Sequence, residues 1–200
     1  MEHSFNKSKF TAAILAGGKN TRFSGRTKAK MMIRGKALIE HTLDKLGEIF
    51  DDIIIITNNR SEFSDYKNIR MYGDIYHDKG PLGGLHSALV NSGRDNVFLL
   101  ASDMPDIDPG LIMRMLDEYT GNECDALLPS HGGFIEPLHA VYRKTMLPSL
   151  NTYLIMSDSL AIRDFLPVVD TRYFELQDIE KRNVFCNINS REDLDSYLKT

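Results

Sequence analysis

Residues 15–28 combine glycine and positive charge at the end of the apolar run TAAILA. The stretch reads LAGGKNTRFSGRTK and holds three glycines and four cationic side chains. Glycine lets the main chain approach a ligand closely, and consecutive backbone N–H groups bind anions. Arg22 and Lys28 would neutralise phosphate charge. The stretch predicts a phosphate-binding loop, with a plain surface loop as the alternative. Its spacing matches neither the P-loop nor the GxGxxG pattern.

A carboxylate suited to a metal ion follows the apolar run VFLLA. The chain continues as SDMPDIDP, which places three aspartates within six residues. A single Asp at the end of a parallel strand is a hard oxygen ligand for Mg²⁺, which also keeps waters and substrate phosphates. We therefore expect Asp103 to bind Mg²⁺. Asp106 and Asp108 also match the DxD pattern of nucleotide-sugar glycosyltransferases, but Asp108 before Pro109 fits a helix N-cap better.

Other polar or glycine-rich segments could either bind a ligand or simply shape a turn. Asn58 and Asn59 follow the run IIIIT and could read a base edge, or form a turn. Asp74 lies six positions before the segment GPLGG at residues 80–84. Glycines at a helix start can leave N–H groups open for an anion, and a tight turn is the alternative. We expect His139, on an apolar run, to be structural.

The apolar pattern predicts the elements that position these residues. Runs without polar alternation are typical of strands buried on both faces, and they lie at residues 11–16, 53–57, 97–101 and 126–129. Helical spacing of apolar residues follows at 39–50, 85–89 and 111–116. Ser190 and Asp193 resemble a capping box that opens a last helix. Residues 144–178 show no clear pattern.

The alternation of strands and helices predicts an α/β fold, a three-layer sandwich with a mostly parallel, Rossmann-like central sheet. Ligands of such sheets bind beyond the carboxyl ends of the strands. The residues that follow each apolar run should therefore meet at one edge of the sheet.

Length and composition favour one domain with small partners. The chain has 200 residues, of which 42% are hydrophobic, which fits a single domain over residues 1–200 with a flexible tail at residues 1–9. A net charge of −4 argues against an extended nucleic-acid surface. Two cysteines without a CxxC pair suit a reducing cytoplasm. With no signal-peptide core and no apolar run near about 18 residues, we expect a cytoplasmic protein without membrane partners. We also expect a monomer without nucleic-acid partners.

The motifs, taken in order, resemble the molybdenum cofactor guanylyltransferases. LAGG with a following Arg and Lys is shared by many nucleotidyltransferases, whereas the later motifs are more specific. The resemblance extends from Ile14 to about Tyr197. Its motifs are LAGG with Arg22, Gly25 and Lys28, then Gly35-Lys36, Asp74 with GPLGG, LLASDMP, EPLHAVY and the terminal NIN at 187–189.

This resemblance implies a nucleotide-diphospho-sugar transferase-like fold and an activity. GMP would pass from GTP to the phosphate of molybdopterin or its molybdenum form, with release of pyrophosphate. Arg22, Lys28 and Asp103 would be catalytic, with Mg²⁺ on Asp103. The implied nucleotide-binding residues are Leu15, Ala16, Gly17, Gly18, Lys28, Asn59, Asp74 and Asp103.

The same resemblance implies an acceptor site and partners. Asn187 and Asn189 would point to one side of an extended segment and contact the pterin or its phosphate, or they would satisfy backbone groups at the start of the last helix. Other proteins of molybdenum cofactor biosynthesis would be transient partners.

The sequence departs from the family pattern at some positions. Lys30 stands where an apolar residue is usual, so either Lys28 or Lys30 could face the phosphates. Thr57 stands where some relatives have asparagine, which leaves base contacts there open. Two other functions remain: a cytidylyltransferase or other nucleotidyltransferase for a phosphorylated acceptor, and a module that binds GTP or the pterin without turnover.

Overall fold

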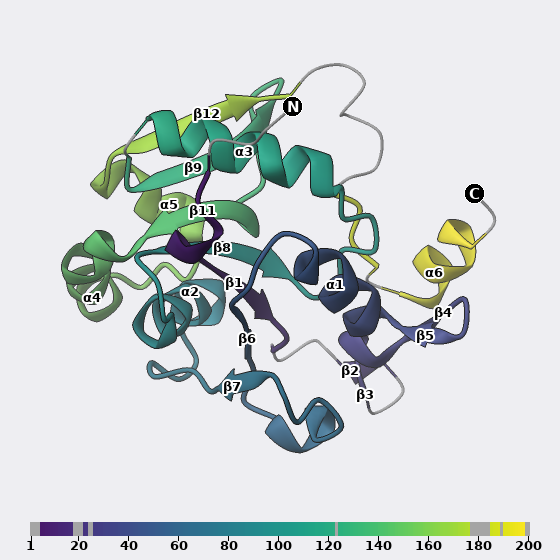
Figure 1. Cartoon of the computed structure of the whole chain (residues 1–200). Coiled ribbons are helices and arrows are strands. Elements are labelled where there is room, and N and C mark those ends of the chain that lie inside the picture. The colour runs from purple at the N-terminus through teal and green to yellow at the C-terminus, as the bar shows by residue number, and fades with distance from the viewer. Residues whose placement is uncertain are drawn as a thin grey trace.

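The computed structural model describes residues 5–17, 22–23, 26–122, 124–176, 185–188 and 190–198. These residues build a central sheet with helices on both faces (Figure 1). Beside this body lie the last helix, α6 (Arg191–Tyr197), and two small hairpins. The hairpins are β2 (Arg22–Phe23) with β3 (Arg26–Thr27), and β4 (Met32–Ile33) with β5 (Lys36–Ala37).

The central sheet contains eight strands among the described residues and is mostly parallel. Its spatial order is β10-β9-β11-β8-β1-β6-β7, and β12 pairs with β9. Strands β8, β1, β6 and β7 run parallel, whereas β11 is antiparallel to both β8 and β9. The strands are β1 (Phe10–Leu15), β6 (Ile53–Ile56), β7 (Arg70–Tyr72), β8 (Asn96–Ala101), β9 (Ala126–His131), β10 (Phe134–Ile135), β11 (His139–Arg143) and β12 (Thr171–Glu175).

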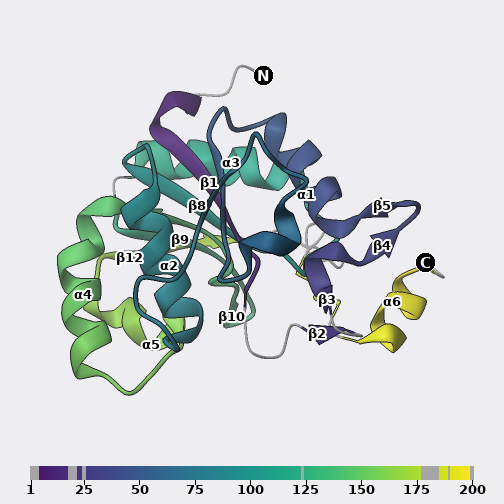
Figure 2. The ribbon, with the colours of Figure 1, turned by 90° about the horizontal axis from the view of Figure 1, so that it is seen from below.

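Alternate side chains of the strands enter two cores, one on each face of the sheet. In β1, Ala12 and Ile14 pack with α1 and α3, whereas Ala13 packs with α2, α4 and α5. This follows from the two-residue period of a strand, and Figure 2 shows the two helical layers. The helices are α1 (Leu38–Gly47), α2 (Gly80–Asn91), α3 (Pro109–Gly121), α4 (Leu147–Met156) and α5 (Ile162–Phe165). The predicted three-layer α/β sandwich is confirmed.

The predicted elements are confirmed with shifted ends. The four apolar runs form β1, β6, β8 and β9, and the three helical patterns form α1, α2 and α3. Ile49 and Phe50 continue the helical pattern in the sequence but lie beyond α1, where they are buried. Their N–H groups both donate to the carbonyl of Leu46. The helix therefore ends earlier than its apolar pattern, because these side chains pack in the turn towards β6.

Both predicted helix caps are confirmed. Asp108 Oδ1 accepts from the N–H groups of Gly110 at 2.8 Å and Leu111 at 3.3 Å. Ser190 and Asp193 form a reciprocal capping box at the start of α6. Such caps satisfy helix N–H groups that otherwise lack partners. Asp108 thus has a structural task, which supports the capping interpretation over the DxD pattern.

The flexible tail predicted for residues 1–9 is wrong for residues 5–9. Lys7–Lys9 form a 3-10 helix. Phe5 is buried with its ring edge against Phe10, and its N–H donates to Asp117 Oδ1 at 3.0 Å. The burial of an aromatic side chain holds this segment on the domain.

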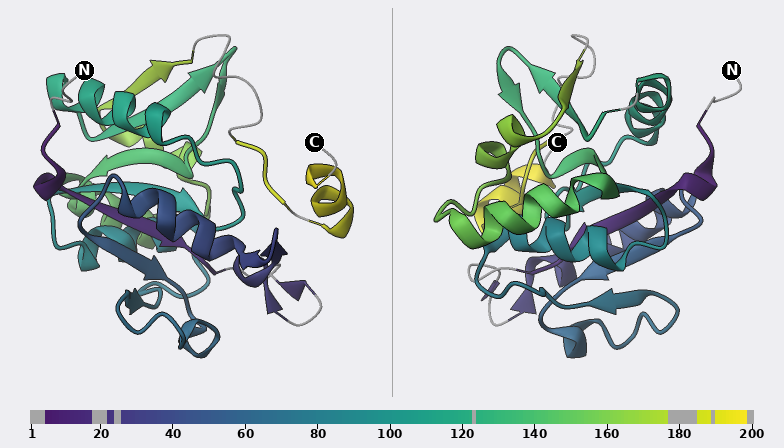
Figure 3. Two further views of the ribbon diagram at one scale, coloured as in Figure 1. Left: turned by 45° about the vertical axis from the view of Figure 1, so that its right-hand side comes forward. Right: turned by 90° about the vertical axis from the view of Figure 1, so that its left-hand side faces the viewer.

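Residues 144–178, which show no clear pattern in the sequence, contain α4, α5 and β12. Figure 3 shows α4 and α5 on the same face of the sheet as α2. Leu150 and Leu154 of α4 and Phe165 of α5 are buried against that face. No helix of the described residues is both long enough and apolar enough to cross a membrane.

Candidate functional site

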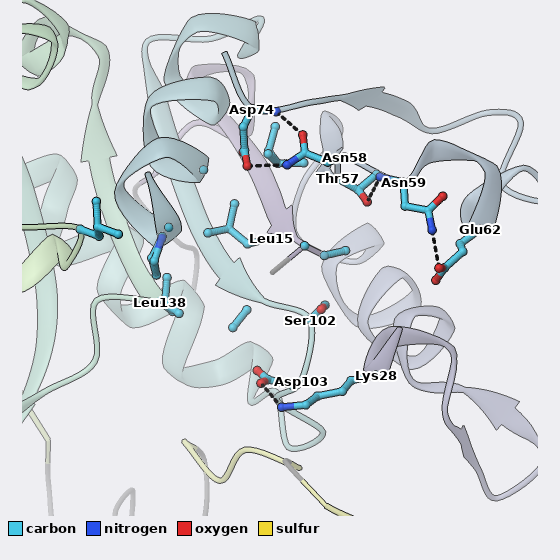
Figure 4. A pocket seen from close by; sticks show the side chains of 18 of the residues that line it. Leu15, Lys28, Thr57, Asn58, Asn59, Glu62, Asp74, Ser102, Asp103 and Leu138 are labelled. Carbon is cyan, nitrogen blue, oxygen red and sulfur yellow. Dashed lines mark hydrogen bonds and ion pairs between the residues drawn. The ribbon is translucent and has the colours of Figure 1, made fainter. Parts of the chain in front are cut away.

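Seven predicted site residues line one cavity beside the ends of β1, β6 and β8 (Figure 4). Its volume is about 790 Å³, within the range of small-molecule sites, roughly 300–1,000 Å³. These residues are Leu15, Ala16, Gly17, Lys28, Asn59, Asp74 and Asp103. The parallel arrangement brings the three strand ends to one edge of the sheet, as the sequence predicted.

Lys28 and Asp103 form an ion pair in this cavity. Asp103 follows β8, and Lys28 begins the 3-10 helix Lys28–Lys30. Lys28 Nζ lies 3.8 Å from Asp103 Oδ2, and the two side chains are only 14% and 24% exposed. Burial raises the pKa of Asp103, and the charge of Lys28 opposes this shift. A partly desolvated carboxylate beside an ammonium group is suited to receive both a cation and a polyanion.

Lys30 is held by aromatic contacts instead. Its Nζ lies 4.3 Å from the centroid of the Tyr66 ring and 3.2 Å from Asp65 Oδ2. A 3-10 helix has three residues per turn, so side chains two positions apart point in different directions. Lys28 therefore faces the cavity, whereas Lys30 contacts the ring of Tyr66.

Negative charge is concentrated near the end of β8. Burial raises the pKa of Glu136, the N–H of Leu138 opposes this by donating to its carboxylate at 3.0 Å, and the charge of Asp103 raises it further. Strand β11 brings this region to β8, because Ala101 N–H donates to the Leu138 carbonyl at 3.0 Å. A bound cation would neutralise this charge.

Asp74 and Asn58 are joined by two hydrogen bonds between the ends of β6 and β7. Asn58 Nδ2 donates to Asp74 Oδ2 at 2.7 Å, and the Asp74 N–H donates to Asn58 Oδ1 at 2.8 Å (Figure 4). Asn59 also lines the cavity, but its amide donates to Glu62 and accepts from Ser61 Oγ. Asn58 is therefore the asparagine that accompanies Asp74.

The GPLGG segment forms the first five residues of α2, so the helix begins earlier than the apolar spacing at residues 85–89 predicted. A Cβ on Gly84 would lie 3.1 Å from the Leu15 side chain, and one on Gly83 would lie 2.9 Å from the carbonyl oxygen of Tyr76. Lack of a side chain thus lets α2 approach the cavity wall closely.

The sequence left open whether N–H groups at this helix start are free to bind an anion. For two of them this is wrong, because they already donate to backbone carbonyls. Leu82 N–H donates to the Leu160 carbonyl at 3.4 Å, and Gly83 N–H donates to the Lys79 carbonyl at 3.0 Å. Pro81 has no N–H to offer. The turn serves packing more than anion binding.

The predicted acceptor segment lies against the loop after β8. Ile188 N–H donates to the Asp103 carbonyl at 2.9 Å. The preceding residue, Asn187, has a buried Oδ1 without a hydrogen-bond partner among the described residues. Gly18, Asn189 and the side chain of Arg22 lie outside the described part of the chain.

His139 is a core residue, as expected. Its fully buried ring packs edge-on against Phe98 and Phe185, with centroids 5.0 and 5.2 Å away. Burial lowers its pKa to about 3. Neither ring nitrogen has a hydrogen-bond partner within the described ranges. The imidazole is thus a neutral packing group at physiological pH.

Three cavity residues were missed by sequence reasoning: Glu62, Asp78 and Leu160. Asp78 has a positive φ of 60°, a conformation that Asp tolerates better than most residues, and the pair Asp78 and Gly80 near a helix start could have signalled a turn. Leu160 comes from the connection between α4 and α5, in the region without a pattern. Packing of this connection on Gly80 and the hydrogen bond from the Leu82 N–H to the Leu160 carbonyl bring it to the cavity.

Known proteins share both the sequence pattern and the fold. The model of the MobA-like NTP transferase domain matches residues 12–168. The protein named "Probable molybdenum cofactor guanylyltransferase" of Peptoclostridium acidaminophilum is 37% identical over 198 residues, which cover 94% of this chain and 87% of that protein. The "Molybdenum cofactor guanylyltransferase" of Syntrophotalea carbinolica is 31% identical over 193 residues, covering 94% and 90%.

A solved structure has the same architecture. The molybdopterin-guanine dinucleotide biosynthesis protein A of Archaeoglobus fulgidus superposes with a TM-score of 0.79 at 25% identity, covering 94% of this chain and 97% of that one. The expected resemblance and the nucleotide-diphospho-sugar transferase-like fold are thereby confirmed.

Proposed function

This chain belongs to the MobA-like NTP transferase family, and on that premise we propose that it transfers GMP from GTP to the phosphate of molybdopterin or its molybdenum form. The observation that carries the proposal is the cavity in which Leu15-Ala16-Gly17, Lys28, Asp74 and Asp103 meet. This is a site with a backbone loop, one cation and two carboxylates. Such a set can hold a base, a triphosphate and a metal in one groove.

The base of GTP would be read by Asp74. Guanine presents two adjacent N–H donors on its Watson–Crick edge, and a carboxylate accepts both. Adenine and cytosine place an acceptor beside a donor, so an ionised carboxylate would face a lone pair. The position of Asp74 on the cavity wall supports this assignment.

Asp103 would hold Mg²⁺, and its environment fits that ion. Its carboxylate is a hard oxygen donor, and Mg²⁺ in proteins is commonly bound through one or two carboxylates together with substrate phosphates and waters. No group of three acidic, His or Cys side chains suited to a metal occurs within the described ranges, so the substrate would complete the coordination. When bound, the ion would offset negative charge on the triphosphate.

Lys28 and Arg22 would stabilise charge on the α- and β-phosphates. An oxygen of the acceptor phosphate attacks the α-phosphorus, the bond from this phosphorus to the bridging oxygen breaks, and pyrophosphate leaves with that electron pair. Protein groups contribute positioning and neutralisation in such transfers. The Lys28 ammonium already lies inside the cavity, next to Asp103.

Asn187 and Asn189 would contact the pterin or its phosphate at the other end of the groove. The contact between Ile188 and Asp103 places this segment beside the loop that would hold the metal. We also propose that the protein acts in the cytoplasm as a monomer that receives the pterin from other molybdenum cofactor biosynthesis proteins. Both cysteines are free thiols, in keeping with a reducing compartment.

One experiment tests the activity. The protein is incubated with molybdopterin, Mg²⁺ and each labelled nucleoside triphosphate in turn, and the product is identified by mass. We expect a GMP adduct and pyrophosphate from GTP alone. A CMP adduct would establish a cytidylyltransferase, and tight GTP binding without an adduct would leave only a binding module.

A further inference from the structure

We propose that Asn58 is a positioning residue that orients the Asp74 carboxylate for guanine and thereby sets the nucleotide preference. This inference rests on the proposed function, because it assigns the base selection of that site to a second residue. Asn58 acts through Asp74 and makes no base contact of its own.

The two hydrogen bonds between Asn58 and Asp74 fix both partners. Asn58 Nδ2 donates to the carboxylate and Asn58 Oδ1 accepts from the Asp74 backbone N–H. A flipped amide would set oxygen against carboxylate and NH₂ against N–H, and would lose both bonds. The amide therefore has one favourable orientation, and the carboxylate is held relative to its own main chain.

The fold prepares the place for this pair. Parallel pairing of β6 with β7 sets Ile56 opposite Tyr72, and the next N–H, that of Thr57, donates to the Tyr72 carbonyl at 2.7 Å. Both strands then end, so residues 58 and 74 leave the sheet side by side. A Cβ on Gly73 would lie 3.1 Å from Asn58 Oδ1. Glycine at position 73 thus leaves room for the amide to lie over the backbone.

Binding capacity remains on the carboxylate. Only Oδ2 accepts from Asn58, and Oδ1 has no hydrogen-bond partner among the described residues. Each carboxylate oxygen can accept two hydrogen bonds. Asp74 can therefore accept the N1–H and N2–H of guanine while Asn58 still holds it.

Orientation matters here because the pair is exposed to solvent. A free carboxylate would rotate and exchange with water, and ordering it would cost free energy on binding. Asn58 supplies that order in advance. Asn59 cannot substitute, because its amide is occupied by Glu62 and Ser61.

The test is a double-mutant cycle of Asn58→Ala and Asp74→Asn, with calorimetric affinities for GTP and for ITP, whose base lacks the N2 amino group. In wild type we expect GTP to bind more tightly than ITP, ATP or CTP. Asn58→Ala should lower the GTP-to-ITP affinity ratio by roughly tenfold, the size of one charge-assisted hydrogen bond. The double variant should be no worse than Asp74→Asn alone.

Asn91→Ala is the matched control, because within the described ranges the Asn91 amide donates only to the carbonyl of Ser87 in α2. The GTP-to-ITP affinity ratio of this variant should equal that of wild type. Asn58→Asp is a second variant that keeps the acceptor but sets a second carboxylate against Asp74, and it should lower the ratio further. Either of two results overturns the role of Asn58: a GTP-to-ITP affinity ratio that is unchanged in both Asn58 variants, or losses of this ratio that add up in the double variant. A wild type without GTP preference overturns the proposed function itself.

Discussion

The backbone N–H of Ile188 donates a hydrogen bond to the carbonyl of Asp103 at 2.9 Å, which joins the C-terminal segment to the loop of the candidate metal ligand. A second bond, from Tyr197 Oη to Asp106 Oδ1 at 2.8 Å, ties α6 to the same loop. Ile188 is also buried with Met31 and other side chains of the β4–β5 region. The segment predicted to bind the acceptor is therefore held by contacts with the loop after β8 and with the β4–β5 region.

Tyr197→Phe should weaken the attachment of α6 to the loop after β8, because it removes the hydrogen bond to Asp106. Loss of one partly buried hydrogen bond costs about 1 kcal/mol, or roughly 2–4 °C in Tm for a chain of this size. We expect a lower Tm and a higher KM for molybdopterin with an unchanged affinity for GTP. Calorimetry and steady-state kinetics measure the three quantities, and an equal loss of GTP affinity would contradict the separation of the two ends of the groove.

Asn187→Ala should weaken acceptor binding selectively. Its Oδ1 is buried and unpartnered within the described ranges, so it can accept a hydrogen bond from a ligand. We expect a severalfold higher dissociation constant for molybdopterin and unchanged GTP binding. Unchanged affinities for both ligands, together with a lowered Tm, would assign Asn187 a structural role.

Lys28→Ala should reduce turnover far more than Lys30→Ala. Lys28 lies in the cavity, whereas Lys30 contacts Tyr66 and Asp65. We expect roughly a hundredfold loss of kcat for the first variant, as for loss of one preorganised charge-stabilising donor. Lys30→Ala serves as the matched lysine control and should mainly lower Tm. The reverse order of damage would place the phosphates at Lys30.

Asp103→Asn should abolish most turnover without lowering stability. Burial raises the pKa of Asp103, so its ionisation at pH 7 opposes folding, and this cost is present at every pH above the raised pKa. The amide removes that charge. We expect more than a hundredfold loss of kcat and a Tm at pH 7 equal to or above that of wild type. Near-normal turnover would rule out the metal assignment.

His139→Phe should make stability less sensitive to acid. The folded pKa is about 3, whereas an unfolded His titrates near about 6.5. Between these values the unfolded chain binds more protons, so stability falls as pH decreases through this window. At pH 4.5 this amounts to about 2–3 kcal/mol. Phenylalanine keeps the ring contacts, so Tm measured from pH 7 to 4.5 should fall less steeply in the variant, and parallel curves would contradict the burial argument.

Local patterns in the sequence were sufficient for the fold class, for the central strands and for the placement of the main candidate site residues, but not for α4, α5 and β12. The strands β1, β6 and β8 could be predicted because they are buried on both faces and have no polar alternation. Once these strands are parallel, Asp103 must lie at the ligand-binding edge. The cap at Asp108 was equally predictable, because a cap depends on residues within one helical turn.

Only the tertiary structure decided which contacts each of several similar side chains makes. Lys28 and Lys30, like Asn58 and Asn59, are chemically alike and nearly adjacent, so composition and spacing cannot separate them. Their directions are set by distant partners: Tyr66 for Lys30 and Asp74 for Asn58. Such contacts depend on how whole elements pack against one another, which is why no short stretch of the sequence encodes them.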